Sequence, residues 1–121
     1  MFRLVACLIL LCSCLSPAVK SQLPAHLVEG QQQLLAGKFD EAATAFAAIT
    51  DAHPNDGQAW MLYGFALHAG GMLEEALVVH EKAANFSVVA AIASDNAACA
   101  AALLGRLDES IGWLTNACNK G

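Results

Sequence analysis

The sequence contains little positive charge, which limits its possible partners. Lys and Arg together number 6 against 11 Asp and Glu, so the formal net charge is −5 at pH 7. Residues 1–21 resemble a removable leader, as described below. Without them the net charge becomes 4 − 11 = −7, because the remaining cations are Lys38, Lys82, Arg106 and Lys120. Phosphate backbones and anionic lipid surfaces repel such a chain. We therefore expect no nucleic-acid partner, and no membrane contact unless an attached lipid provides one.

The sequence also lacks the motifs that enzymes and metal sites require. The four histidines are not spaced i, i+4 and form no H-E-x-x-H motif. There is no G-x-S-x-G nucleophile elbow and no glycine loop ahead of a phosphate-binding helix. The acidic pairs are adjacent in sequence, and adjacent residues do not face each other on a helix. We expect no catalytic activity, no cofactor and no bound metal ion.

Long apolar runs are absent as well. The longest, Leu4–Leu15, is broken only by Ser13 and is too short for a membrane span, which needs about 20 residues. It follows the positive start Met1–Arg3 and precedes Pro17, an order typical of a secretory signal peptide. The segment around Cys14 also resembles a lipobox, so lipidation at Cys14 is the alternative. Both interpretations predict export to the periplasm, the cell envelope or the outside, with residues 1–21 as leader and 22–121 as mature domain.

Cysteine is scarce in the mature segment. Only Cys99 and Cys118 remain after the leader, and no C-x-x-C motif suggests a zinc ribbon or a redox site. Two thiols in an oxidising compartment can pair, so a disulfide is one possibility. The favoured interpretation is that both are small apolar side chains buried in the core, as free cysteines commonly are.

A repeated pattern dominates the rest of the sequence. Glycine, any residue, a large apolar residue, two acids and a small residue occur three times at a spacing of 34 residues. The copies begin at Gly37, Gly71 and Gly105. This period predicts a helix-turn-helix unit stacked on identical units. Each glycine can close one helix at positive φ, and each acidic pair then stabilises the N-terminus of the next.

The pattern predicts an all-α fold with six helices and no strand. Their expected ranges are 24–36, 40–52, 58–69, 74–84, 89–104 and 108–119, with repeats at about 23–56, 57–90 and 91–121. Asn55 or Asp56 is the expected cap of the third helix, and Ser87 that of the fifth. Equivalent positions hold Gly30, Gly64 and Ala98, where a neighbouring helix must approach closely.

These residues resemble the tetratricopeptide repeat over positions 23–119. The resemblance rests on Gly30, Gly37, Ala42, Phe46, Pro54, Trp60, Gly64, Gly71, Ala76, Ala83, Gly105 and Ala117. Three departures are His26 for the leading Trp, His80 for a large apolar residue and Ser110 for Ala. The resemblance implies an α-solenoid of three repeats wound as a right-handed superhelix. It also implies that the first helices line a concave groove that binds proteins or peptides without catalysing a reaction.

The expected groove residues lie on one stripe of the first helices. They are Leu27, Gln31, Met61, Phe65, His68, Asp95 and Cys99, with Leu34 in the same columns. Packing in the core is an equal alternative for Phe65 and a weaker one for Met61. Some relatives hold an acidic chaperone tail with a cationic clamp, but the matching positions here are Leu27, Gln31, Leu62, Ile92 and Asn96.

The sequence thus supports two hypotheses on function. The first is an exported, non-catalytic scaffold that binds a protein or peptide in its groove. The alternative is a self-assembling structural protein of the cell envelope that buries the uncapped ends of its repeat array as a homo-oligomer. In either case, contact with the membrane is expected only if Cys14 is lipidated.

Overall fold

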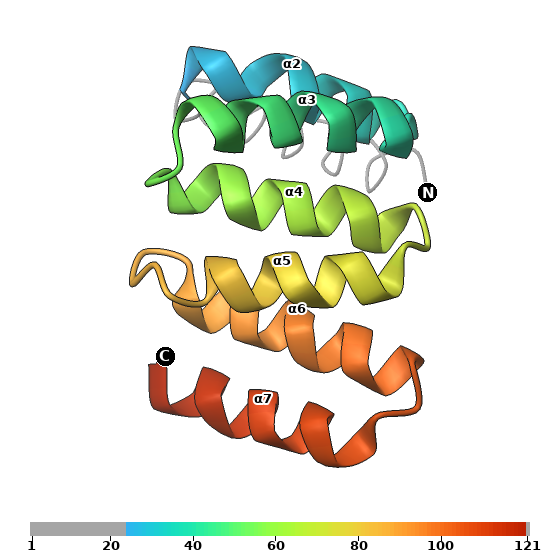
Figure 1. Cartoon of the computed structure of the whole chain (residues 1–121), viewed down its shortest axis with the longest axis vertical. Coiled ribbons are helices and arrows are strands. Elements are labelled where there is room, and N and C mark those ends of the chain that lie inside the picture. The colour runs from blue at the N-terminus through green and yellow to red at the C-terminus, as the bar shows by residue number, and fades with distance from the viewer. Residues whose placement is uncertain (1–23, 121) are drawn as a thin grey trace, which may run out of the picture.

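The computed structural model describes residues 24–120, which form six helices packed one after another (Figure 1). The helices are α2 (Ala25–Leu35), α3 (Phe39–Ala52), α4 (Gly57–Ala69), α5 (Leu73–Ala83), α6 (Ala90–Leu103) and α7 (Leu107–Lys120). The all-α prediction is confirmed, and the helix bounds lie within one or two residues of the expected ranges. The predicted signal peptide and the possible lipidation site at Cys14 lie outside the described residues.

In each of the three repeats, a turn at a glycine joins the first helix to the second. Gly37, Gly71 and Gly105 have φ of 76°, 83° and 76°, and no other described residue has positive φ. In each turn the N–H of the next residue donates to a carbonyl five positions back, at 2.9 Å: Lys38 to Gln33, Met72 to Leu67, and Arg106 to Ala101. These bonds satisfy carbonyls at the helix end, as in a Schellman motif. Acidic pairs follow in the first turns of α3, α5 and α7.

The two junctions between repeats differ. At the first, Asp56 caps α4, because its carboxylate accepts a hydrogen bond of 3.1 Å from the N–H of Ala59. At the second, α6 begins after Val89 with no side-chain cap, so the prediction that Ser87 caps this helix is wrong. The backbone supplies the turn instead, because the N–H of Val89 donates to the carbonyl of Phe86.

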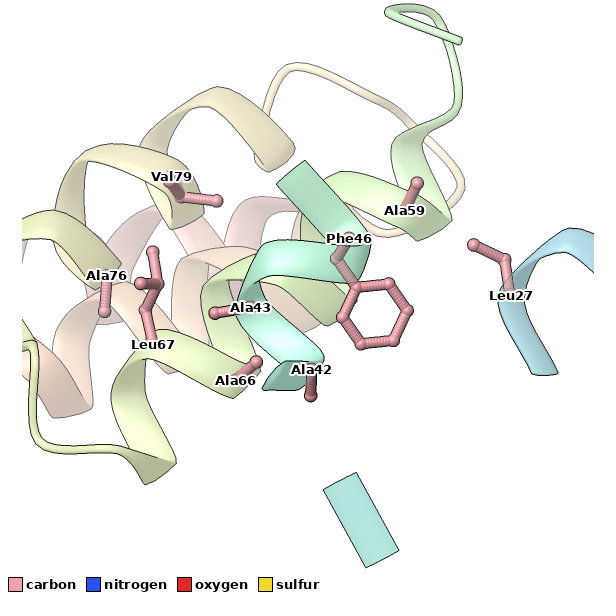
Figure 2. Close-up of a cluster of buried hydrophobic side chains, with 9 residues drawn as sticks. All are labelled: Leu27, Ala42, Ala43, Phe46, Ala59, Ala66, Leu67, Ala76 and Val79. Carbon is pink, nitrogen blue, oxygen red and sulfur yellow. The ribbon is translucent and has the colours of Figure 1, made fainter. Parts of the chain in front are cut away.

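The core of the first two repeats depends on rings packed against glycines. Phe46 is fully buried, and a Cβ at Gly30 would lie only 2.7 Å from its ring (Figure 2 shows Phe46 among its neighbours). His80 occupies the equivalent place in the second repeat, where a Cβ at Gly64 would lie 2.5 Å from its Nδ1. The missing side chain therefore lets the paired helices approach closely in both repeats.

The third repeat is packed mainly by alanine. The buried face of α6 comprises Ala90, Ala93, Ser94, Ala97, Ala98, Ala100 and Ala101. Ser110 donates a hydrogen bond of 2.8 Å from its hydroxyl to the carbonyl of Ala98, which ties α7 to α6. Cys99 and Cys118 are free and exposed, so the expected burial of both thiols is wrong.

Candidate peptide-binding groove

A mostly apolar cavity of about 340 Å³ opens between the first helices of the three repeats. All of its lining residues come from α2, α4 and α6, the first helices of the three repeats, which the family resemblance implies line a concave groove. The apolar lining residues are Leu34, Leu35, Met61, Leu62, Phe65 and Ile92, and the polar ones are Gln31 and Asn96. We call this set the groove.

Three of the predicted groove residues, Gln31, Met61 and Phe65, line the cavity. Phe65 is 49% exposed, so its ring is open to a ligand as well as packed against neighbours. Leu27 does not line the groove. It is fully buried in the core cluster with Phe46 and Ala59, which corrects its predicted place.

His68, Asp95 and Cys99 do not line the cavity either. Two of them form a separate contact between α4 and α6, where Cys99 Sγ lies 3.9 Å from His68 Nε2. Asp95 is exposed on α6. The cavity therefore includes three of the seven predicted groove residues, Gln31, Met61 and Phe65, and excludes the other four.

Leu34, which the sequence placed in the groove columns, also lines the cavity, and four lining residues were not expected there: Leu35, Leu62, Ile92 and Asn96. The sequence did indicate that three of them face the groove, because Leu62, Ile92 and Asn96 stand at the positions that form the cationic clamp in some relatives. Leu34 stood in the same columns as the chosen residues. Leu35 is the last residue of α2 and is 82% exposed, and its position in the sequence gave no indication of this role.

The chemistry of the groove suits an uncharged, apolar ligand. No ionisable side chain lines it, and its walls are aliphatic, aromatic and thioether groups. Gln31 and Asn96 each offer an amide N–H₂ donor and a carbonyl acceptor, the groups that pair with a peptide backbone. Met61 adds a flexible side chain that adapts to irregular apolar shapes.

Helix α5, which packs against the groove helices α4 and α6, carries an uncharged, buried histidine, His80. Burial, together with the nearby charge of His68, lowers the pKa of His80 to about 4. Neither ring nitrogen of His80 has a hydrogen-bond partner, and its ring lies 6.0 Å from that of His68 between centroids. His80 is therefore neutral at pH 7 and serves as a packing residue against Gly64.

A second polar contact joins the start of α2 to the start of α4. His26 Nε2 lies 2.8 Å from Asp56 Oδ2 and donates a hydrogen bond to it. Burial alone would raise the pKa of Asp56, but the hydrogen bonds from His26 and from the N–H of Ala59 outweigh it and lower that pKa. Between residues 24 and 120, no cluster of three or more His, Cys, Asp and Glu side chains is arranged to hold a metal ion.

Comparison with known proteins identifies this architecture. Residues 33–85 match the family model described as tetratricopeptide repeat, which confirms the resemblance of the sequence to this family. None of the curated proteins matches the chain.

Solved structures show the same fold. One is the Yersinia enterocolitica type III secretion translocator chaperone SycD in an alternative dimer. It is 21% identical with a TM-score of 0.74, over 78% of this chain and 72% of SycD. Another structure of that chaperone is 18% identical with a TM-score of 0.74, over 85% and 74% of the two chains. A mutant of MamA is 21% identical with a TM-score of 0.70, over 76% of this chain but only 50% of MamA.

The family defines the broad class of function. Tetratricopeptide repeats are protein-binding modules whose scaffold is typically non-catalytic, and no enzyme family matches the chain. Within residues 24–120, none of the helices combines the length and the apolar character that crossing a bilayer requires.

Proposed function

We propose that this protein is an exported, non-catalytic module that holds an extended peptide segment by its apolar side chains. The observation that carries this proposal is the groove, a cavity of about 340 Å³ with six apolar and two amide side chains. Pockets of about 300–1,000 Å³ with a few convergent polar groups are the usual form of a binding site.

The exposure of the groove residues supports a ligand that buries apolar groups. Phe65, Ile92 and Leu35 are 49%, 56% and 82% exposed, although they are large hydrophobic residues. Fully burying an aliphatic or aromatic side chain contributes about 1.5–3 kcal/mol. Covering these three therefore gives roughly 3–5 kcal/mol before the cost of association. A peptide with two or three apolar side chains has the matching chemistry, and Gln31 and Asn96 can pair with its backbone.

The similar structures support the same kind of partner. SycD is described as a translocator chaperone of type III secretion, a protein that acts on another protein. The absence of any charged lining residue in our groove favours a segment whose contacting side chains are uncharged, rather than an acidic tail.

Site-specific photo-crosslinking tests the proposal in cells that produce the protein. A photoreactive amino acid at position 92, in the groove, is expected to capture a protein through an apolar segment. The same amino acid at position 78 is the matched control, because Val78 is 66% exposed on α5 and lies outside the groove. Equal capture at both positions, or none at position 92, contradicts groove binding.

A substitution then measures the contribution of the groove. The recovered segment, made as a labelled peptide, is expected to bind Phe65→Asp at least about 10-fold more weakly than wild type, because a carboxylate replaces the exposed ring. Val78→Asp is expected to bind within about 2-fold of wild type. Fluorescence anisotropy measures both affinities, and equal losses in the two variants count against the proposed site.

The export part of the proposal rests on the N-terminal sequence pattern. Intact-mass measurement of the protein from its native cells is expected to find an N-terminus after Ala18 or Ser21, or a lipid-bearing Cys14. A protein that retains Met1 and the following apolar run contradicts export by this leader.

A further inference from the structure

The outer face of α7 carries an uncovered apolar stripe. Leu107, Ile111 and Leu114 follow the spacing i, i+4, i+7, and Cys118 continues it at i+11. The three hydrophobic residues are 65%, 62% and 47% exposed, and Cys118 is exposed as well. Ser110 is the only buried residue of this 14-residue helix. We call these four residues the α7 stripe; their 3–4 spacing is that of a seam between two packed helices.

The opposite end of the stack has a different surface. Figure 1 shows α2 and α3 at one end and α7 at the other. In α2 and α3 the only large hydrophobic residue with high exposure is Leu35, and it lines the groove. Head-to-tail stacking of two copies would therefore press the α7 stripe against a surface with no matching apolar row. Of the two ends of the stack, the α7 end of a second copy is therefore the one that presents a matching apolar row.

Charge also favours pairing of like ends at α7. Residues 106–120 contain Arg106 and Lys120 against Asp108 and Glu109, a net charge of 2 − 2 = 0. Residues 25–52 contain Lys38 against Glu29, Asp40, Glu41 and Asp51, a net charge of 1 − 4 = −3. Two copies of the first repeat repel each other, whereas two copies of α7 carry no net repulsion.

We propose that two copies of this protein associate through the α7 stripe, with the two α7 helices antiparallel about a two-fold axis. In this orientation the start of each helix, where Asp108 and Glu109 outweigh the charge of Arg106, lies beside the basic end of the other, at Lys120. A parallel arrangement would place acid beside acid and Lys120 beside Lys120. An isologous contact of this kind closes as a dimer and does not propagate.

The stripe determines the register of the pair. Its centre lies between residues 112 and 113, so Leu107 of one copy lies opposite Cys118 of the other. Ile111 then lies opposite Leu114. On the flanks Asp108 lies toward Thr115 of the other copy, a hydroxyl that can donate a hydrogen bond to a carboxylate. The groove residues lie on α2, α4 and α6, so the dimer presents two open grooves.

Sedimentation velocity of the purified protein at about 1–200 µM tests the association. The wild type is expected to change from monomer to dimer within this range, and Ile111→Asp to raise the dissociation constant about 100-fold by burying a carboxylate in the seam. Val78→Asp is the control, because Val78 is similarly exposed at 66% but lies on α5. A wild type that is monomeric throughout, or equal effects of the two variants, overturns the proposal.

Disulfide trapping tests the orientation. The variant combines Leu107→Cys with Cys99→Ser and keeps the native Cys118. Positions 107 and 118 are about 16 Å apart along one helix, beyond the reach of about 7 Å for a disulfide, so no bond can form within one chain. Mild oxidation is expected to join position 107 of one copy to position 118 of the other. Bonds that join 107 to 107 or 118 to 118 overturn the antiparallel arrangement, and failure to crosslink while dimers are present overturns the use of α7.

Discussion

His80→Phe is the sharpest test of how this fold is packed. In the first repeat the ring of Phe46 covers Gly30, and in the second the ring of His80 covers Gly64. Both rings are fully buried, but the nitrogens of His80 have no partner. Phenylalanine at position 80 keeps a flat ring against Gly64 and removes both unpaired polar atoms.

The expected gain in stability has a part that does not depend on pH. A buried polar group without a partner costs about 1–3 kcal/mol. We expect His80→Phe to raise the free energy of unfolding by roughly 1–3 kcal/mol at pH 7.5. Phe46 shows that the repeat accommodates a ring of this size at the equivalent place.

A second part depends on pH through the lowered pKa of His80. The pKa of this group is about 4 in the folded protein against 6.5 ordinarily, so the unfolded chain binds more protons between these values. The wild type therefore loses stability as pH falls from 6.5 to 4, by about 1.4 kcal/mol per pH unit. Between pH 7.5 and pH 5 this loss reaches about 2 kcal/mol, and His80→Phe lacks it.

Urea unfolding followed by circular dichroism at pH 7.5 and 5.0 measures both parts. The advantage of His80→Phe over wild type is expected to grow by about 2 kcal/mol at the lower pH. His53→Phe is a control, because His53 is exposed, and it is expected to change stability by less than about 0.5 kcal/mol. If His80→Phe destabilises the protein at pH 7.5, or shows the same pH dependence as wild type, the packing argument is refuted.

Three further predictions concern a packing contact between helices, a turn and a cap. Gly64→Ala is expected to lower the free energy of unfolding by about 1–3 kcal/mol, because its methyl group would lie 2.5 Å from His80 Nδ1; urea unfolding measures the loss, and truncation of the ring by His80→Ala should relieve part of it. Gly71→Ala is expected to cost about 1 kcal/mol in the same assay from its φ of 83° alone, since nothing lies within 4 Å of the added Cβ, and no loss would contradict the assigned turn. Asp56→Ala is expected to cost about 1–2 kcal/mol at pH 7 through loss of the α4 cap and of the bond from His26. Because the pKa of Asp56 is lowered in the fold, this difference should shrink as pH falls through that pKa, and thermal melts between pH 7 and 3 that show a constant difference would contradict it.

The 34-residue period was sufficient to predict the fold. Gly37, Gly71 and Gly105 occupy the positive-φ turns that the spacing indicates, and the acidic pairs begin the second helices. The period could not predict the second junction, where Ser87 resembles a cap but the helix begins later. A capping residue type indicates that a helix starts nearby, whereas the turn geometry decides where.

The groove was only partly predictable, for a physical reason. The period shows which residues are equivalent, but their burial depends on what covers each repeat. Leu27, Met61 and Asp95 are equivalent positions, yet the first is buried, the second half-buried and the third exposed. Leu27 belongs to the core cluster with Phe46 and Ala59, whereas Asp95 lies on a face of α6 that belongs to none of the core clusters. Cys99 and Cys118 were misjudged for the same reason.

The helices contact chiefly the helices beside them in sequence, with weaker contacts only between α2 and α4 and between α4 and α6. Such short-range connectivity favours rapid folding, because little loop entropy is lost before contacts form. It also means that the helices can unfold one after another, beginning at one end of the stack. In the monomer, amide hydrogen exchange should therefore be fastest in α7, which is the least buried of the six described helices, and should slow progressively toward α4 and α5.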